Sequence, residues 1–161
     1  MIVNSLIPSL RRQVKLQWRG IHGVSHWARV RQNGLYLSKI TGANAMVVEL
    51  FAFLHDSCRL NDGYDPDHGA RAAVFAQSLH GSVFTLSAQD LEVLVIACQG
   101  HTHSGTSDDV TIQTCWDADR LDLGRVGIRP LAERLCTDAA RDPVLIEWAY
   151  QRSVWNVQWD R

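Results

Sequence analysis

The sequence predicts an all-α protein, and three observations support this fold class. Apolar residues recur at helical spacing wherever they are periodic, and no stretch alternates long enough to indicate a strand. Helix-start signals recur along the chain, at Ser87–Asp90 and at the Asp-Pro pairs that begin at Asp65 and Asp142. Loop-forming segments lie at residues 20–23, 61–65 and 103–107. We therefore expect a single compact multi-helix domain over residues 1–161.

The predicted helices cover residues 3–16, 25–41, 44–56, 66–80, 88–101, 108–123 and 143–157. The first helix begins with an apolar stretch, and Arg11 and Arg12 follow this stretch within the helix. The second carries His26, Val30, Leu37 and Ile40 on one face, provided that it continues through Gly34. The third contains an apolar run over residues 46–54, which is typical of a buried helix.

The later helices begin at the start signals named above. In the last one, Leu145, Trp148 and Trp155 are spaced to share a face, with Trp159 beyond them. We expect this face to pack on the core of its own chain. A dimer seam built from tryptophan is the alternative, so we expect a monomer or a homodimer.

Composition excludes several classes of partner. With 161 residues, 46% of them hydrophobic, the chain can fill one core. A formal net charge of −1 is too weak to favour nucleic acid or an anionic membrane. No charge-free segment approaches the roughly 18 residues that span a bilayer, and the amino terminus lacks the residue order of a signal peptide. Because the four cysteines also lack CxxC spacing, we expect a cytoplasmic protein with free thiols.

The adjacent residues His55 and Asp56, which end the apolar run, are the most informative feature of the sequence. An imidazole and a carboxylate are costly in an apolar core, whereas both are good ligands for a divalent metal. Neighbours on a helix point roughly 100° apart, so they can flank one ion. The missing ligands must come from elsewhere, and His26 and Asp119 are the candidates. Alone, such a pair is more often hydrogen-bonded inside a core than bound to a metal.

Four short motifs occur in order between residues 22 and 122. They are His22-Gly23-Val24-Ser25-His26-Trp27-Ala28-Arg29-Val30, then His55-Asp56, then Asp67-His68-Gly69-Ala70-Arg71, and finally Asp117-Ala118-Asp119-Arg120-Leu121-Asp122. Together they resemble the HD-domain superfamily of metal-dependent phosphohydrolases. The motif-bearing core then covers residues 20–125, and the last predicted helix lies outside it.

The resemblance implies an HD-type helical fold and a metal held by His26, His55, Asp56 and Asp119. Two imidazoles and two carboxylates form a donor set suited to Mn, Fe, Co, Ni, Zn or, less well, Mg. Two-metal members of the superfamily add histidines from later helices, with the aspartate bridging both ions. His68 and His101 are therefore candidates for a second metal. The alternative is that either histidine binds substrate or caps a helix.

The activity implied by the resemblance is hydrolysis of a small phosphate ester, such as a nucleotide, by metal-activated water. Asp56 then serves catalysis as well as metal binding. Arg59, where many members have a lysine, is expected to bind the substrate's phosphate and to assist catalysis. His22 and His101 are further candidates for substrate binding. We expect Arg29 and Arg120 to brace the ligands, Asp122 to orient one of them, and Asp117 to face solvent or cap a helix.

Two other functions remain open at this point. The myo-inositol oxygenase-like group of HD-fold proteins is similar in ligand order but holds two irons and activates dioxygen, which would require His68 and His101. A non-catalytic sensor that holds a nucleotide in the same site is the third class. Substrate and metal identity cannot be read from the sequence, because specificity lies in loops of unknown shape.

Overall fold

The computed structural model describes the backbone of residues 2–159 and the side chains of residues 4–155. The elements follow in the order α1 (Ile2–Gln13), α2 (Val24–Thr41), α3 (Ala45–Leu54), α4 (His68–Leu79), α5 (Ala88–Gly100), α6 (Val110–Arg120), the 3-10 helices η1 (Leu123–Val126) and η2 (Ala132–Arg134), and α7 (Pro143–Trp159). Within residues 2–159 there is no strand, and the sole bridge joins His80 to Phe84. The prediction of a compact all-α fold is confirmed.

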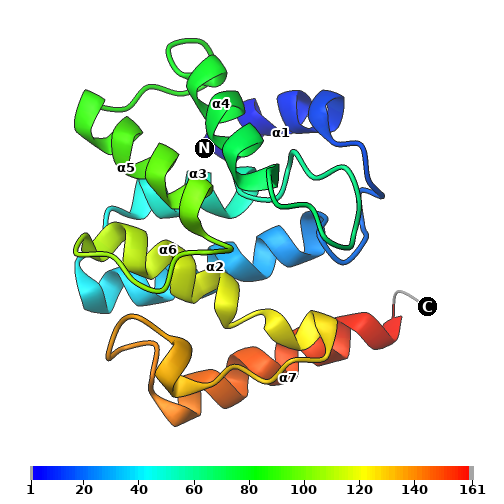
Figure 1. The fold of residues 1–161 in the computed structure, drawn as a ribbon, viewed down its shortest axis with the longest axis vertical. Coiled ribbons are helices and arrows are strands. Elements are labelled where there is room, and N and C mark those ends of the chain that lie inside the picture. The colour runs from blue at the N-terminus through cyan, green and yellow to red at the C-terminus, as the bar shows by residue number, and fades with distance from the viewer. Residues whose placement is uncertain (1, 160–161) are drawn as a thin grey trace.

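Helix α3 lies at the centre of the core. All its residues from Val47 to Leu54 are buried except Glu49, because α2, α5 and α6 pack around it (Figure 1). A second, smaller apolar cluster attaches α7 to α2 and to the turn after α6, with Leu37, Leu121 and Leu145 among its members. The two clusters place α7 and η1 along one side of the core, as the lower part of Figure 1 shows.

Side-chain caps fix several helix starts. Asn44 accepts hydrogen bonds from the first turn of α3, and Asp109 does so for α6. Ser87 caps α5 and Asp142 caps α7, as the sequence signals predict. The start predicted after Asp65 is wrong, because α4 begins at His68 and the Asp65 carboxylate binds elsewhere.

Several helices end earlier than predicted, and the ends of α3 and α6 matter for the site. Helix α3 ends at Leu54, so that His55 and Asp56 stand in the turn that follows it. Helix α6 ends at Arg120 and gives way to η1, instead of continuing to residue 123. The polar side chains are therefore delivered by helix ends, where the chain can turn them toward a common point.

The predicted core face of α7 is wrong for its tryptophans. Leu145 is buried, but Trp148 is 40% exposed and Trp155 is 58% exposed, and the side chain of Trp159 lies outside the described side chains. The side chains of α7 that are buried are instead Leu145, Ile146, Ala149 and Ser153, among those that the structure describes. A Cβ atom on Gly124 would come within 2.1 Å of Ser153 Oγ and 2.9 Å of Tyr150 Cδ2, so this glycine allows η1 to pack closely on α7.

No helix in residues 2–159 is long and apolar enough to cross a membrane. The four cysteines are free thiols, as predicted. Burial raises the pKa of Cys58, Cys98 and Cys115, so these three thiols stay protonated and behave as small apolar groups.

Candidate metal centre

The ends of five helices meet at one buried point. His26 comes from the first turn of α2, and Asp119 from the last turn of α6. His55 and Asp56 follow α3 directly, while His68 opens α4 and His101 follows α5; all four are buried. The structure thus brings together all six residues that the sequence predicts as metal ligands.

The first group of ligand atoms lies around the Nε2 atoms of His26 and His55, which are 3.0 Å apart. Asp56 Oδ2 lies 3.5 Å from the first and 3.7 Å from the second. Asp119 Oδ1 lies 3.4 Å and 3.6 Å from the same two nitrogens. Asp119 is therefore as close to the histidines as Asp56 is, although 63 residues separate the two in the sequence.

A second group shares Asp56 with the first. Its other oxygen, Oδ1, lies 3.2 Å from His68 Nε2 and 3.6 Å from His101 Nε2. The Nε2 atoms of His68 and His101 are 2.8 Å apart. Asp56 therefore offers one carboxylate oxygen to each histidine pair, and the structure contains two buried groups that could each hold a metal.

The hydrogen bonds of the four imidazoles decide which ring nitrogen carries the hydrogen. In each ring Nδ1 faces an oxygen of a carboxylate or a backbone carbonyl. These oxygens are Asp122 Oδ2 for His26 (2.7 Å), Phe51 O for His55 (3.1 Å), Asp65 O for His68 (2.5 Å) and Cys98 O for His101 (2.7 Å). Because such oxygens only accept, a neutral ring must donate through Nδ1 and present a lone pair at Nε2.

The resulting arrangement of lone pairs needs a cation. In each histidine pair two Nε2 lone pairs face one another at hydrogen-bonding distance, with carboxylate oxygens beside them. Asp119 Oδ1 is buried and has no hydrogen-bond partner among the described residues. In the second pair, His68 Nε2 also has two donors beside it, Arg59 Nη1 at 3.1 Å and Thr102 Oγ1 at 3.3 Å. Lone pairs that converge repel one another, whereas a divalent ion between them satisfies all of them. The donor set therefore fits a metal.

Both carboxylates of the centre are ionised at neutral pH. Burial alone would raise the pKa of Asp119, but His55, Arg125 and His26 hold it well below its usual range. Burial opposes ionisation of Asp56 in the same way, and the surrounding imidazoles, His55 first, hold its pKa low. Two anionic carboxylates in a buried site require compensating positive charge, which a metal would supply.

Of the two arginines predicted as braces, Arg29 contacts a ligand's partner, whereas Arg120 bonds to the loop after α5. Arg29 forms a two-pronged ion pair with Asp122, at 2.6 and 3.0 Å, and Asp122 in turn receives His26 Nδ1. These contacts outweigh burial and lower the pKa of Asp122. Arg120 donates to the carbonyls of Ser104 (2.6 Å) and Gly105 (2.9 Å), and so ties the loop after α5 to the end of α6.

Asp117 does not face solvent. It is fully buried and accepts hydrogen bonds from the backbone nitrogens of Cys136 (2.6 Å) and Thr137 (2.8 Å). Residues 117 and 119 lie roughly 200° apart around α6, so Asp119 can face the centre while Asp117 anchors the loop on the far side. That loop forms part of the wall of the adjoining cavity.

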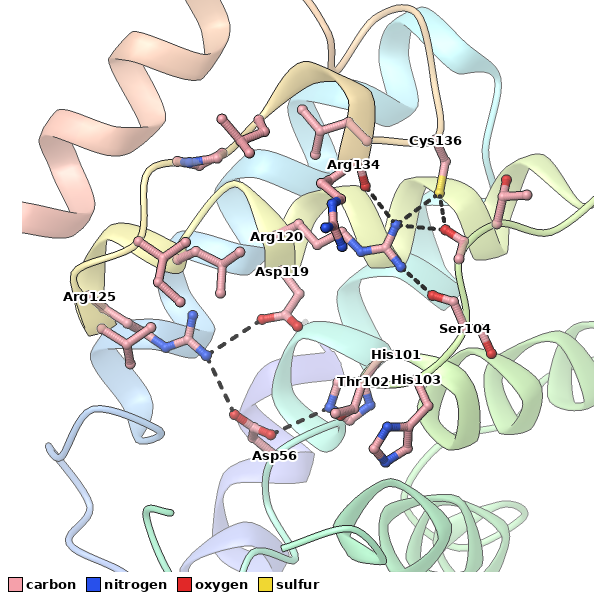
Figure 2. Close-up of a pocket in the computed structure, with 18 of the residues that line it drawn as sticks. Asp56, His101, Thr102, His103, Ser104, Asp119, Arg120, Arg125, Arg134 and Cys136 are labelled. Carbon is pink, nitrogen blue, oxygen red and sulfur yellow. Dashed lines mark hydrogen bonds and ion pairs between the residues drawn. The ribbon is translucent and has the colours of Figure 1, made fainter. Parts of the chain in front are cut away.

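A cavity of 920 Å³ opens onto the metal centre (Figure 2). Asp56, His68, His101 and Asp119 line one end of it, and residues 123–136 supply much of the remaining wall. Six arginines but only three carboxylates line this cavity, in a chain whose net charge is −1. Positive charge is thus concentrated where a ligand would enter, which favours an anionic ligand.

Arg59 and His22, predicted as substrate-binding residues, both line the cavity but are tied to one loop. Arg59 donates to Asn61 O (3.3 Å) and Gly63 O (2.8 Å), and its Nη1 lies 3.1 Å from His68 Nε2. His22 Nδ1 lies 2.9 Å from the Asp62 carboxylate. Burial lowers the pKa of His22, so its ring is neutral at neutral pH.

Sequence reasoning missed Arg125, which belongs to no motif. It lies in η1, one turn beyond Asp122, and its Nη2 atom lies 3.8 Å from Asp119 Oδ1 and 4.0 Å from Asp56 Oδ2 (Figure 2). The only available signal was its i+3 spacing from Asp122, which is weak without the knowledge that α6 ends at Arg120.

Searches of protein-family models, curated proteins and solved structures give no match for this chain. The functional argument therefore depends on the residues themselves. Its strongest parts are the two histidine pairs on Asp56, the orphaned Asp119 oxygen and the arginine-rich cavity.

Proposed function

We propose that this protein is a metal-dependent hydrolase of the HD-domain type that acts on a small phosphate ester. The single observation that carries the proposal is the position of Asp56, which presents one oxygen to each of two buried histidine pairs at the end of an arginine-lined cavity. Paired metal sites bridged by a carboxylate are a recurrent solution for phosphoryl transfer, because they act on the attacking and the leaving oxygen together.

The proposed reaction breaks the bond from phosphorus to the ester oxygen and joins the oxygen of water to phosphorus. One proton of the water is lost, and the leaving alcohol gains one. Bound metal ions would acidify the water and draw charge from the phosphoryl oxygens. The chain itself holds the imidazoles in their ligand tautomer through Asp122 and the backbone carbonyls, and it keeps Asp56 and Asp119 ionised. The cavity arginines offset the negative charge of the phosphate.

The metal we propose is Mn, Fe, Co, Ni or Zn in preference to Mg. Four imidazoles and two carboxylates are too nitrogen-rich for Mg, which prefers oxygen ligands and water. One or two ions per chain fit the geometry, because the two groups share Asp56 and no other ligand atom.

The deciding experiment combines metal analysis with a panel of phosphate esters. Protein purified under metal-replete conditions is analysed by mass spectrometry and assayed for phosphate release, beside the metal-stripped protein and Asp56→Ala. We expect release that depends on metal and is absent from Asp56→Ala. A metal-loaded parent that cleaves no ester of a broad panel would overturn the hydrolase proposal, and nucleotide binding without turnover would then favour a sensor.

A di-iron oxygenase is the second candidate, and the His68–His101 pair favours it. This pair completes a four-histidine, two-carboxylate donor set that suits iron at both positions. The metal analysis separates the candidates when it is paired with an anaerobic assay. Phosphate release that proceeds equally without dioxygen supports the hydrolase, whereas two irons and dioxygen uptake with no phosphate release support the oxygenase.

A further inference from the structure

Arg125 is held rigidly at the rim of the metal centre. It is only 8% exposed, its Nε donates to Ile21 O (3.0 Å), and its Nη1 donates to Asp122 O (3.1 Å). Two of its three nitrogens are thus anchored to backbone carbonyls. Because the guanidinium is planar, these two bonds also set the direction of Nη2.

The Nη2 atom points at the centre without completing a contact there. Its distances of 3.8 Å to Asp119 Oδ1 and 4.0 Å to Asp56 Oδ2 exceed the 2.7–3.2 Å expected for a hydrogen bond of this type. Nη2 donates no hydrogen bond within the described part of the chain, although Arg125 lines the cavity. Its N–H groups are therefore available to a ligand that enters the cavity.

A guanidinium cannot ligate a metal, so a metal ion would not satisfy Nη2. An oxygen atom carrying negative charge beside the two carboxylates would do so. The other arginine next to Asp56 differs on this point. Arg59 also donates through two nitrogens to loop carbonyls, but its third nitrogen, Nη1, already lies 3.1 Å from His68 Nε2. Among the described residues, it is thus Arg125 and not Arg59 that has a nitrogen without a hydrogen-bond partner at the centre.

We propose that Arg125 binds the substrate's phosphate, with Nη2 donating to a non-bridging phosphoryl oxygen. This inference rests on the proposed function for the identity of its ligand. It replaces the sequence-based expectation for Arg59 with a different residue, and it gives Arg59 the role of bracing the loop at residues 60–65 and His68. In this position Arg125 contacts the group that reacts, so it is a catalytic residue.

The test measures phosphate binding and metal content on the same samples. Metal-loaded parent, Arg125→Ala, Arg125→Lys and Arg59→Ala are titrated with inorganic phosphate by calorimetry, after their metal is counted by mass spectrometry. We expect Arg125→Ala to keep its metal, because removing a cation cannot weaken the binding of another cation nearby, and to lose phosphate affinity on the order of ten- to a hundredfold. Arg125→Lys should recover part of the loss, since it keeps the charge without the fork.

Guanidinium ion added at low concentration provides a second readout. It should restore phosphate binding to Arg125→Ala and leave Arg59→Ala unchanged, which a purely structural role of Arg125 would not produce. Circular dichroism on every variant checks folding, and Arg125→Lys keeps the comparison usable if the alanine variant does not fold.

Three results would overturn the inference. They are loss of metal in Arg125→Ala together with Arg125→Lys, phosphate binding by both variants equal to that of the parent, and failure of the metal-loaded parent to bind phosphate. A parent that binds phosphate through Arg125 but hydrolyses no ester would instead defeat the proposed function and leave the assignment of Arg125 intact.

Discussion

The Nδ1 atom of His26 lies 2.7 Å from Oδ2 of Asp122, and both groups are buried. This contact turns the lone pair of His26 Nε2 toward the metal centre, and Arg29 holds the carboxylate from its other side. Helix α2 and the turn after α6 thereby determine the orientation of one ring. The folded chain therefore holds the His26 ring in this orientation without a metal ion.

Asp122→Asn tests this preorganisation. The amide keeps the shape but loses the charge, and its NH₂ group would face Arg29 or the His26 ring. We expect metal affinity to fall on the order of ten- to a hundredfold, measured by competition with a chromogenic chelator. Asp108→Asn, at an exposed position, is the control and should bind metal as the parent does. Equal affinity in Asp122→Asn and the parent would show that Asp122 does not orient the ligand.

Asp56 belongs to both groups of ligands. Its replacement should therefore weaken the binding of both metal ions, whereas replacement of a histidine should weaken the binding of one. We expect two ions per chain in the parent, one in His68→Ala and none retained tightly in Asp56→Ala. His26→Ala should weaken the first group and leave the His68–His101 group able to bind. Metal counts by mass spectrometry after gel filtration check this. One ion per chain in both the parent and His68→Ala would eliminate the second site.

Sequence reasoning found the ligands because each stands in a short motif at the end of a predicted helix. His55 and Asp56 follow an apolar run that had to be buried, so their polar groups had to meet a partner inside the protein. The same reasoning could not find Arg125. Its approach to Asp56 depends on the early end of α6 and on the carbonyl of Ile21, which is 104 residues away in the sequence.

The errors in the predicted fold likewise arise from contacts that the sequence does not reveal. The Asp65-Pro66 pair looks like a helix start, but Asp65 has a stronger set of partners in Arg71 and the backbone nitrogen of Leu60. The spacing of Trp148 and Trp155 indicates a shared face without saying which face is buried. The inner face of α7 instead carries Leu145, Ile146, Ala149 and Ser153, and only the tertiary contacts of α7 reveal this choice of face.

The ion pair between Asp65 and Arg71 predicts how stability depends on pH. Arg71 Nη2 lies 2.6 Å from both Asp65 oxygens, and Leu60 N donates to the same carboxylate at 2.8 Å. Burial acts to raise the pKa of Asp65, but these contacts lower it below its value in the unfolded chain. A depressed folded pKa means that the ionised carboxylate stabilises the fold above the unfolded pKa, and that this contribution is lost as pH falls through the folded pKa.

We therefore expect Asp65→Asn to cost about 1 kcal/mol of unfolding free energy at neutral pH, a modest figure because Arg71 is partly exposed. The difference from the parent should begin to shrink below about pH 4 and vanish at lower pH. Urea titrations of the metal-free proteins at several pH values measure it, with Asp67→Asn as the control at an exposed neighbour. A difference that grows on acidification would contradict the assigned sign.

Gly69, directly after His68, provides a way to move the second histidine pair without touching a ligand. A Cβ atom at this position would lie 2.5 Å from the backbone oxygen of Cys98, which cannot rotate away, and 3.4 Å from His101 Cε1. Gly69→Ala must therefore push α4 and α5 apart. We expect a loss of roughly 1–3 kcal/mol in stability from this overpacking, partly offset by the better helix propensity of alanine. Binding of the second ion should weaken, because His68 and His101 come from the two helices that separate, while the group around His26 and His55 should bind as before.

Gly105→Ala is the matched control, since an added Cβ there meets no atom within 4 Å. Denaturant titration and metal counts on both variants decide the matter. If Gly69→Ala binds two ions as tightly as the parent, the spacing of α4 and α5 does not control the second site.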